Sequence, residues 1–211
     1  MAERFEQSRE WLLLFTRYPE PGQAKTRLIP ALGAEGAAVL QRRMAETVIG
    51  RIAELCRERP VRFEIRYTGG DEQRVRNWLG SAGPGRLQGD GDLGARLERG
   101  FAAAFARGGE RVVTVGSDCP DLSPAIIGQG FDALMDHDLV LGPSPDGGYY
   151  LIGLRSPQPA LFADMEWGTD SVLPRTLSRA RALGLSVARL ETLVDVDRPE
   201  DLKYFRDHPH P

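Results

Sequence analysis

Short apolar runs and longer amphipathic stretches alternate along this sequence. Residues 11–16 and 112–115 form apolar runs of strand length, a pattern typical of strands buried on both faces of a sheet. Residues 61–67 alternate between apolar and polar side chains, which predicts a strand with one face toward the core. The pattern predicts further strands near residues 86–88, 139–141, 149–154 and 185–190.

Between these strands, apolar residues recur every three or four positions, the period of a helix that packs on a core. Helices are predicted over about residues 34–57, 71–79, 93–105, 123–135 and 170–183, and from residue 199 onward. Ser123 and Pro124 suit an N-cap and a first helical position. Since strands and helices alternate almost throughout, we expect an α/β fold, a mostly parallel sheet with helices on both faces.

Composition narrows the class of protein. A chain of 211 residues suits one sizeable domain, which we expect to span residues 1–211. The formal net charge of −3 provides no basic field for nucleic acid. No apolar run approaches the roughly 20 residues needed to cross a bilayer, and the N-terminal residues do not resemble a signal peptide. We therefore expect a cytoplasmic protein without membrane insertion, and the sequence leaves its oligomeric state open.

Cysteine and histidine offer little chemistry. Cys56 and Cys119 are too few for a disulfide framework and lack metal-site spacing. Of the three histidines, His208 and His210 lie in the C-terminal tail and His137 precedes an acidic turn. This distribution disfavours a zinc site or a His-based catalytic triad.

Ligands of open α/β sheets bind beyond the carboxyl ends of the strands, and three polar clusters follow predicted strands here. The first cluster comes after residues 11–16 and contains Arg17, Gly22, Lys25 and Arg27. Cations and backbone amides in a tight loop can hold phosphate, although the glycine and lysine spacing of a P-loop is absent. A basic turn that only faces solvent is the alternative interpretation.

The second cluster follows residues 112–115 and contains Asp118 and Asp121. A carboxylate at a strand end is well placed to hold Mg²⁺ or Mn²⁺ against phosphate oxygens. Acidic residues before a helix can instead act as caps. We therefore assign the metal to Asp118 and a capping or supporting role to Asp121.

The third cluster lies between the strands predicted at residues 139–141 and 149–154. Its Asp-Gly-Gly sequence predicts a tight hairpin turn, and the side chains beside the turn are candidates to line a sugar or acceptor pocket. The residues concerned are Ser144, Asp146, Gly147, Gly148 and Tyr149.

Two later segments carry further candidates. Trp167 either stacks on a base or sugar, with Thr169 beside it in the substrate pocket, or packs in the core, as tryptophan more often does. Asp195 and Asp197 precede the last helix. The start of that helix explains only the acidic residues after Pro199.

Five segments, in their order along the chain, resemble a known family. They are residues 13–28 (LLFTRYPEPGQAKTRL), 88–96 (QGDGDLGAR), 116–122 (GSDCPDL), 141–153 (LGPSPDGGYYLIG) and 167–169 (WGT). The family is that of bacterial arsenosugar-biosynthesis-type glycosyltransferases, or radical-SAM/selenodomain-associated transferases, in the GT-A, nucleotide-diphospho-sugar transferase superfamily. The similarity runs from about Leu12 to Leu202 and implies a GT-A fold.

The resemblance also implies roles for individual residues. In GT-A enzymes a carboxylate after a central strand binds the metal on the nucleotide diphosphate, which corresponds to Asp118. Gln88, Asp92 and Arg96 lie where related enzymes contact nucleotide. The sequence has Asp-Cys-Pro-Asp where the usual pattern is Asp-X-Asp, so a second metal ligand must come from elsewhere.

The second ligand is suggested by residues 195–202. This segment is similar to the terminal Asp-Val-Asp-Thr-Pro-Glu-Asp-Leu block of sugar-acid cytidylyltransferases and phospholactate guanylyltransferases, in some of which a late aspartate completes the metal site. Asp197 is therefore the expected second ligand, and Asp195 is the alternative. Arg198 stands where that block has threonine.

Two reactions fit these residues. In the first, the sugar of a nucleotide-diphospho-sugar passes to a small acceptor, with Asp146 as the candidate base and the metal and basic loop offsetting charge on the leaving diphosphate. In the second, a phosphorylated or acidic acceptor attacks a nucleoside triphosphate and releases pyrophosphate, while Lys25 and Arg27 hold phosphates. The family resemblance favours the first reaction and the basic loop favours the second. A non-catalytic nucleotide-binding domain is the third hypothesis, because fold alone never establishes catalysis.

Overall fold

A sheet of seven strands forms the centre of the computed structural model, which describes residues 8–206 and so excludes His208 and His210. The strands are β1 (Glu10–Arg17), β2 (Arg62–Thr68), β3 (Gly85–Leu87), β4 (Arg111–Gly116), β5 (Leu139–Pro143), β6 (Tyr149–Leu154) and β7 (Val187–Arg189). They lie in the order β3-β2-β1-β4-β6-β5-β7, and every neighbouring pair is parallel except the two that contain β6. The predicted mostly parallel sheet is confirmed.

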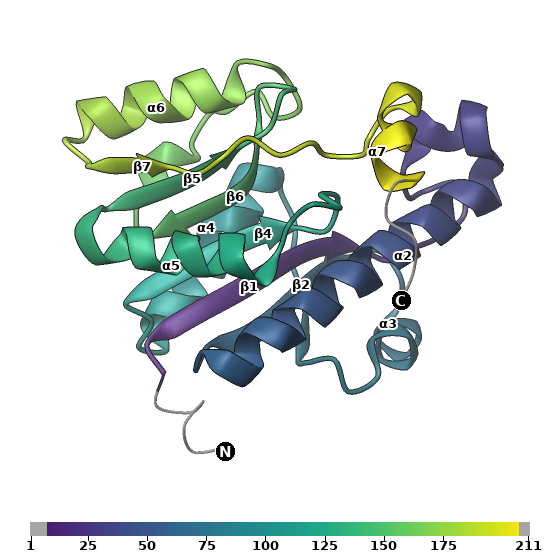
Figure 1. Cartoon of the computed structure of the whole chain (residues 1–211), viewed down its shortest axis with the longest axis horizontal. Helices are drawn as coiled ribbons and strands as arrows, with labels where there is room; N and C mark the ends of the chain where they lie inside the picture. Colours follow the sequence, from purple (N-terminus) through teal and green to yellow (C-terminus); the bar gives the residue numbers. More distant parts are fainter. Residues whose placement is uncertain (1–7, 207–211) are drawn as a thin grey trace.

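Helices cover both faces of this sheet (Figure 1). They are α2 (Ile29–Glu58), α3 (Glu72–Leu79), α4 (Leu93–Ala106), α5 (Pro124–Asp136), α6 (Val172–Ala182) and α7 (Leu202–Arg206). Side chains of α2, α3 and α5 pack with Leu12 and Leu14 of β1, whereas those of α4 and α6 share a core with Leu13. Because successive side chains of a strand point to opposite faces, the two groups of helices lie on opposite sides of the sheet, as predicted.

The long helix α2 begins earlier than its apolar pattern indicates. It starts at Ile29 rather than near residue 34, and it is kinked at Gly33, where φ is 70° and ψ is 168°. Glycine adopts such angles without the steric cost of a side chain, and Pro30 in the first turn loses no helical hydrogen bond. These two residues make the first turn resemble a loop in the sequence. Neither α2 nor any other helix in the described residues is long and apolar enough to span a membrane.

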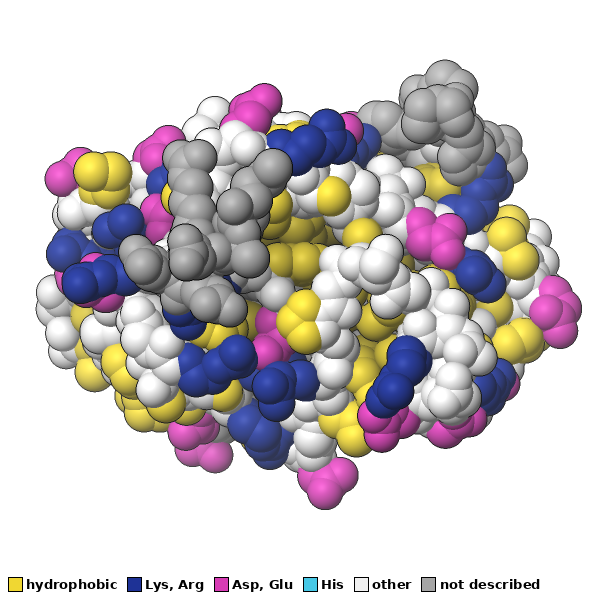
Figure 2. All heavy atoms as spheres, turned by 90° about the horizontal axis from the view of Figure 1, so that it is seen from below, with side chains coloured by type: hydrophobic (Ala, Val, Ile, Leu, Met, Phe, Trp, Pro, Cys, Tyr) yellow, Lys and Arg dark blue, Asp and Glu magenta, His cyan; other side chains and the backbone are white. Residues whose placement is uncertain are grey.

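A pocket of about 920 Å³ opens near the start of β1, lined by Trp11, Phe63 and the end of α2. Seen from below, the molecule has a hollow with a hydrophobic floor and basic side chains near it (Figure 2). The basic residues that line the pocket are Arg57, Arg62 and Arg107. Among residues 8–206, the only carboxylate lining the pocket is that of Glu64. It is buried and paired with arginines 66, 86 and 107. The acidic candidates therefore lie elsewhere, at the carboxyl ends of the strands.

Candidate active site

The segment after β7 crosses the carboxyl ends of the central strands. Backbone hydrogen bonds fix this crossing, from the N–H groups of Leu190, Leu193 and Val196 to the carbonyl oxygens of Leu141, Pro143 and Asp118 at 2.9, 3.1 and 2.9 Å respectively. Val196 is fully buried and packs with Leu28, Leu40 and Met44. The buried valine thus anchors the segment, and its neighbours Asp195 and Asp197 come to lie beside the end of β4.

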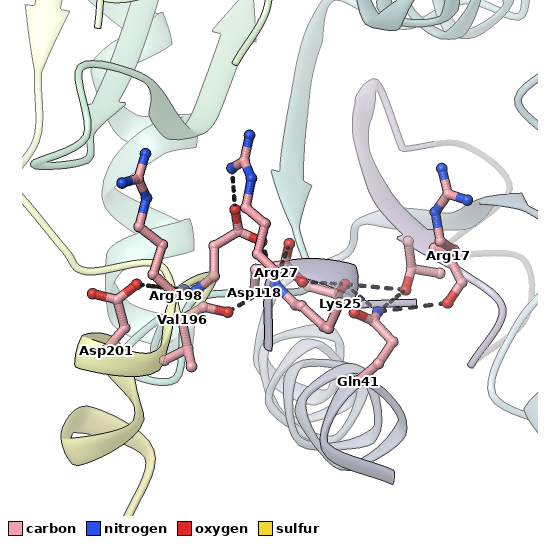
Figure 3. A network of polar contacts seen from close by, with 11 residues as sticks. Arg17, Lys25, Arg27, Gln41, Asp118, Val196, Arg198 and Asp201 are labelled. Carbon is pink, nitrogen blue, oxygen red and sulfur yellow. Dashed lines mark hydrogen bonds and ion pairs between the residues drawn. The ribbon is translucent and has the colours of Figure 1, made fainter. Parts of the chain in front are cut away.

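Lys25 lies between the carboxylates that this crossing brings together. Its backbone has left-handed angles, φ 49° and ψ 46°, and its side chain is only 3% exposed. The Nζ atom lies 2.9 Å from Asp118 Oδ2 and 3.5 Å from Asp197 Oδ1, and it donates to the carbonyl oxygen of Val196 at 2.8 Å. Figure 3 shows these contacts in one row of polar side chains. The ammonium therefore joins β4 to the C-terminal segment.

Three arginines predicted to bind nucleotide surround the same space. Arg17, Arg27 and Arg96 all line a pocket of about 690 Å³ beyond the ends of β1 and β4. Lys25, Gln88, Asp118, Tyr149, Tyr150, Asp195 and Asp197 line it as well. Arg27 is 56% exposed and forms an ion pair with Asp197. The pocket therefore combines positive charge from residues 17–27 and from α4 with carboxylates from the segments that follow β4 and β7.

A buried polar network that the sequence analysis missed supports Asp118. Ser117 Oγ donates to Asp118 Oδ1 at 3.2 Å and accepts from Thr16 Oγ1 at 3.0 Å. Gln41 Nε2 donates to Ser117 Oγ at 3.2 Å and to Thr16 Oγ1 at 3.3 Å. One signal was present, since Gln41 lies among the apolar residues of α2 that face the core, where an amide must find partners.

The other nucleotide-binding candidates differ in their positions. Gln88 is buried, and its Nε2 donates to the carbonyl oxygens of Thr16 and Arg66 at 3.1 and 3.0 Å, so it ties the ends of β1 and β2 to the pocket wall. The carboxylate of Asp92 accepts from the Ala95 N–H at 2.9 Å and caps α4. It does not line the pocket of about 690 Å³. Gly22 lies in the loop before Lys25, with φ 78° and open space around it.

Another pocket, of about 520 Å³, adjoins the pocket of about 690 Å³ and shares Arg27, Asp195 and Asp197 with it. Three residues from the predicted substrate pocket line it, namely Ser144, Asp146 and Thr169. The turn between β5 and β6 forms the predicted hairpin, in which Asp146 Oδ1 accepts from the Gly148 N–H at 2.9 Å. The three shared residues therefore form a common wall between two cavities.

The remaining candidates for the substrate pocket lie in this turn or pack beside it. Gly147 has φ 86°, and a Cβ added there would lie 2.3 Å from the Cα of Asp170. Trp167 lines neither pocket and packs edge-on against Tyr149, with ring centroids 6.4 Å apart. Burial raises the pKa of the Tyr149 phenol, which keeps it protonated. Trp167 thus packs within the protein, the interpretation that its residue type favoured over stacking on a ligand.

The pKa values of Asp195 and Asp197 are shifted in opposite directions. Burial, reinforced by the charge of Asp118, raises the pKa of Asp195 to about 7. Burial also acts to raise the pKa of Asp197, but the charges and hydrogen bonds of Lys25 and Arg27 outweigh it and lower that pKa. Asp197 is therefore the carboxylate that stays ionised beside Lys25, whereas Asp195 is poised to take up a proton.

Asp118 and Asp197 suit a divalent cation that arrives with phosphate. Their side chains are 41% and 39% exposed, so both carboxylates reach the pocket, and carboxylate oxygens are the ligands that Mg²⁺ and Mn²⁺ prefer. No group of three or more acidic, histidine or cysteine side chains in the described residues forms a complete metal site. Mg²⁺ commonly uses one or two carboxylates and takes its other ligands from substrate phosphates and water, which fits this pair.

Comparison with known proteins gives one family and one fold. The family described as "Uncharacterized protein conserved in bacteria (DUF2064)" matches residues 51–169. The crystal structure of a candidate nucleotide-diphospho-sugar transferase from Desulfovibrio desulfuricans G20 is 34% identical, with a TM-score of 0.88, over 94% of this chain and 87% of that one. No curated protein matches the chain.

Two more distant structures share only the fold. One is 4-diphosphocytidyl-2C-methyl-D-erythritol synthase from Anaerococcus prevotii DSM 20548, at 11% identity and a TM-score of 0.61, over 95% of this chain and 100% of that one. The other is glucosyl-3-phosphoglycerate synthase from Mycobacterium tuberculosis, in complex with Mn²⁺, uridine diphosphate and glucosyl-3-phosphoglycerate. It is 15% identical, with a TM-score of 0.59, over 96% of this chain and 77% of that one. The predicted nucleotide-diphospho-sugar transferase fold is confirmed.

Proposed function

This chain belongs to the DUF2064 family of bacterial proteins, and from that membership we propose that it is a GT-A-type glycosyltransferase that uses Mg²⁺ or Mn²⁺. It would bind a nucleotide-diphospho-sugar and transfer the sugar to a small acceptor. The observation that carries this proposal is the pair of adjoining pockets that share Arg27, Asp195 and Asp197. A donor and an acceptor held in these pockets would meet at the common wall. The narrower arsenosugar-type assignment stays a prediction.

The donor belongs in the pocket of about 690 Å³, where guanidinium groups are gathered. Arg17, Arg27 and Arg96 would bind the diphosphate, because guanidinium groups donate paired hydrogen bonds to phosphate oxygens. Asp118 and Asp197 would hold the metal. When bound, the metal would supply positive charge against the leaving diphosphate.

The acceptor belongs in the pocket of about 520 Å³. An acceptor hydroxyl would attack the anomeric carbon of the sugar, the bond from that carbon to the diphosphate oxygen would break with its electron pair on the diphosphate, and the hydroxyl proton would pass to a base. Asp146 is the candidate base, since its carboxylate is exposed to this pocket and held by the Gly148 N–H. Asp195 is part of the common wall. Because burial raises its pKa to about 7, its charge would change with pH near neutrality and alter the electrostatic potential at the wall.

The charges of the acceptor pocket favour glycosyl over nucleotidyl transfer. Five aspartates and two arginines line it. A phosphorylated or carboxylated acceptor would meet like charge there, whereas a hydroxyl-bearing neutral acceptor would find hydrogen-bond acceptors. Nucleotidyl transfer is the second candidate, and the observation in its favour is that three arginines face one pocket that also has room for a triphosphate.

A ligand-stabilisation experiment tests the proposal. Melting temperature is measured with nucleoside diphosphates, nucleoside triphosphates and nucleotide sugars, each with Mg²⁺, Mn²⁺ or EDTA. A ligand at 100 times its Kd adds about 2.7 kcal/mol of stability. Stabilisation by a diphosphate and its sugar, lost in EDTA, is the expected result. Stabilisation by triphosphates alone would favour nucleotidyl transfer. If none of these nucleotides stabilised the protein, the non-catalytic hypothesis would be favoured.

A further inference from the structure

Lysine is rare in this chain, and one of its two lysines lies in the candidate site. The chain has 27 basic residues, of which only Lys25 and Lys203 are lysines. A lysine ammonium is a compact charge with three N–H donors and no acceptor. The Nζ of Lys25 has three acceptors within 3.5 Å, one oxygen each from Asp118, Asp197 and Val196. Every donor of the ammonium therefore has a partner within the protein.

This arrangement differs from a lysine that waits for a phosphate. Its side chain is 3% exposed, while the two carboxylates beside it are 41% and 39% exposed. The carboxylates thus face the pocket, and the ammonium lies behind and between them. In this position it supplies the positive charge that two neighbouring carboxylates require.

We propose that Lys25 is a resident cation that competes with a divalent metal for Asp118 and Asp197. This inference rests on the proposed function, in which those two carboxylates hold the metal. Two cations near one carboxylate pair repel each other, and the repulsion is larger in a half-buried site than in water. Metal alone therefore binds weakly. Metal that arrives with phosphates binds well, because the negative charge of the phosphates offsets the repulsion between the metal and the ammonium. Lys25 in this way couples metal binding to nucleotide binding.

The first experiment measures binding of Mn²⁺ alone by the electron paramagnetic resonance signal of the free ion. The proteins are the unmodified chain, Lys25→Met and the matched control Lys203→Met. Lys25→Met should bind Mn²⁺ at least tenfold more tightly than the unmodified chain, and Lys203→Met should not differ from it. Adding Asp118→Asn to Lys25→Met should abolish the gain. A folded Lys25→Met protein that binds Mn²⁺ no better than the unmodified chain would overturn the inference.

A second measurement keeps the inference testable if Lys25→Met does not fold. Amine acylation of the unmodified protein is followed at both lysines by mass spectrometry, with Lys203 as the internal reference. Lys25 should react at least tenfold more slowly than Lys203, and saturating Mn²⁺ should speed its reaction by releasing it from the carboxylates. Equal rates at the two lysines, or no effect of Mn²⁺ on Lys25, would contradict the proposed competition.

The two proposals fail in different ways. If no nucleotide binds with metal, the proposed function fails even when Lys25→Met gains affinity for Mn²⁺. If nucleotide binding depends on metal but Lys25→Met shows no gain, the proposed function stands and the resident-cation role of Lys25 fails.

Discussion

The N–H of Val196 donates to the carbonyl oxygen of Asp118 at 2.9 Å, although the two residues come from segments far apart in the chain. This bond joins the C-terminal segment to the end of β4. Asp195 and Asp197 lie on either side of Val196 in the sequence, so one backbone contact brings two more carboxylates to the site. The contact therefore brings together aspartates from two separate segments in a chain that lacks an Asp-X-Asp motif after β4.

Removing the charge of Asp118 should abolish metal-dependent nucleotide binding without unfolding the protein. In Asp118→Asn, the increase in melting temperature caused by nucleotide with Mn²⁺ should disappear, because a neutral amide oxygen holds a divalent cation more weakly than a charged carboxylate. Asp136→Asn, at the exposed end of α5, should keep the full increase. Metal-dependent stabilisation that survives in Asp118→Asn would remove this residue from the metal site.

Arg96→Ala should weaken nucleotide binding more than it affects folding. Arg96 lines the pocket of about 690 Å³, and its buried Nε has no hydrogen-bond partner among the described residues, so it can donate to a phosphate that enters the pocket. The loss should be about 1.5–3 kcal/mol, typical of a hydrogen bond to a charged group, as measured by calorimetric titration. Arg181→Ala, exposed near the end of α6, serves as the control. Equal affinities for the two variants would remove Arg96 from the nucleotide site.

Gln41→Leu should destabilise the fold, although leucine is about as large as glutamine. The substitution removes the donor shared by Thr16 and Ser117, and loss of a buried partner costs about 1–3 kcal/mol. Urea unfolding measures the change in the free energy of unfolding. Gln129→Leu on the exposed face of α5 should change it by less than about 0.5 kcal/mol. If both variants cost the same, the buried network does not contribute to stability.

Two glycines with positive φ should respond differently to alanine. Gly22 has φ 78° and nothing within 4 Å of an added Cβ, so Gly22→Ala should cost only the backbone strain, roughly 1–2 kcal/mol. At Gly147 the added Cβ would lie 2.3 Å from the Cα of Asp170 and 2.4 Å from its carbonyl oxygen. Gly147→Ala should therefore cost about 1–3 kcal/mol more. Thermal unfolding of both variants tests whether Gly147→Ala is the more destabilising. A larger loss of stability in Gly22→Ala would contradict the prediction.

Asp138 should contribute an acid-dependent part of stability. Its carboxylate accepts from Ser186 Oγ at 2.6 Å and from the Ser186 N–H at 2.9 Å, and these hydrogen bonds lower its pKa. A lowered carboxylate pKa stabilises the fold above the pKa of the unfolded chain, and this stability is lost as pH falls through the lowered pKa. Asp138→Asn should therefore flatten the fall in stability that begins as pH approaches about 3.9, the pKa of an unperturbed aspartate, and continues below it. Identical pH profiles for the variant and the unmodified protein would show that this bond adds nothing.

Local sequence patterns predict most of the fold because each element carries its own period. The apolar runs at residues 11–16 and 112–115 became the central strands β1 and β4, and Asp-Gly-Gly predicted the hairpin between β5 and β6. The first turn of α2 was missed, because Pro30 and Gly33 locally favour a loop and only the kinked geometry accommodates them.

The candidate site is harder to predict because its contacts are not local. The sequence places Lys25 in a basic loop, yet nothing near it in the chain indicates that its ammonium meets Asp118 and Val196. The pairing of Asp118 with Asp197 came from family resemblance rather than from any periodicity. The function of Gln41 was readable in principle, since a polar side chain on a buried helix face requires partners.

Lys25 and Val196 are separated by 171 positions in the chain, and this separation has a consequence for folding kinetics. Closing a long loop costs entropy that grows with the logarithm of its length, and contacts between distant segments slow folding. The sheet around β1 should therefore assemble before the C-terminal segment reaches it, and the transition state should lack the finished site. A nucleotide that binds only the finished site would then leave the folding rate unchanged and act entirely by slowing unfolding.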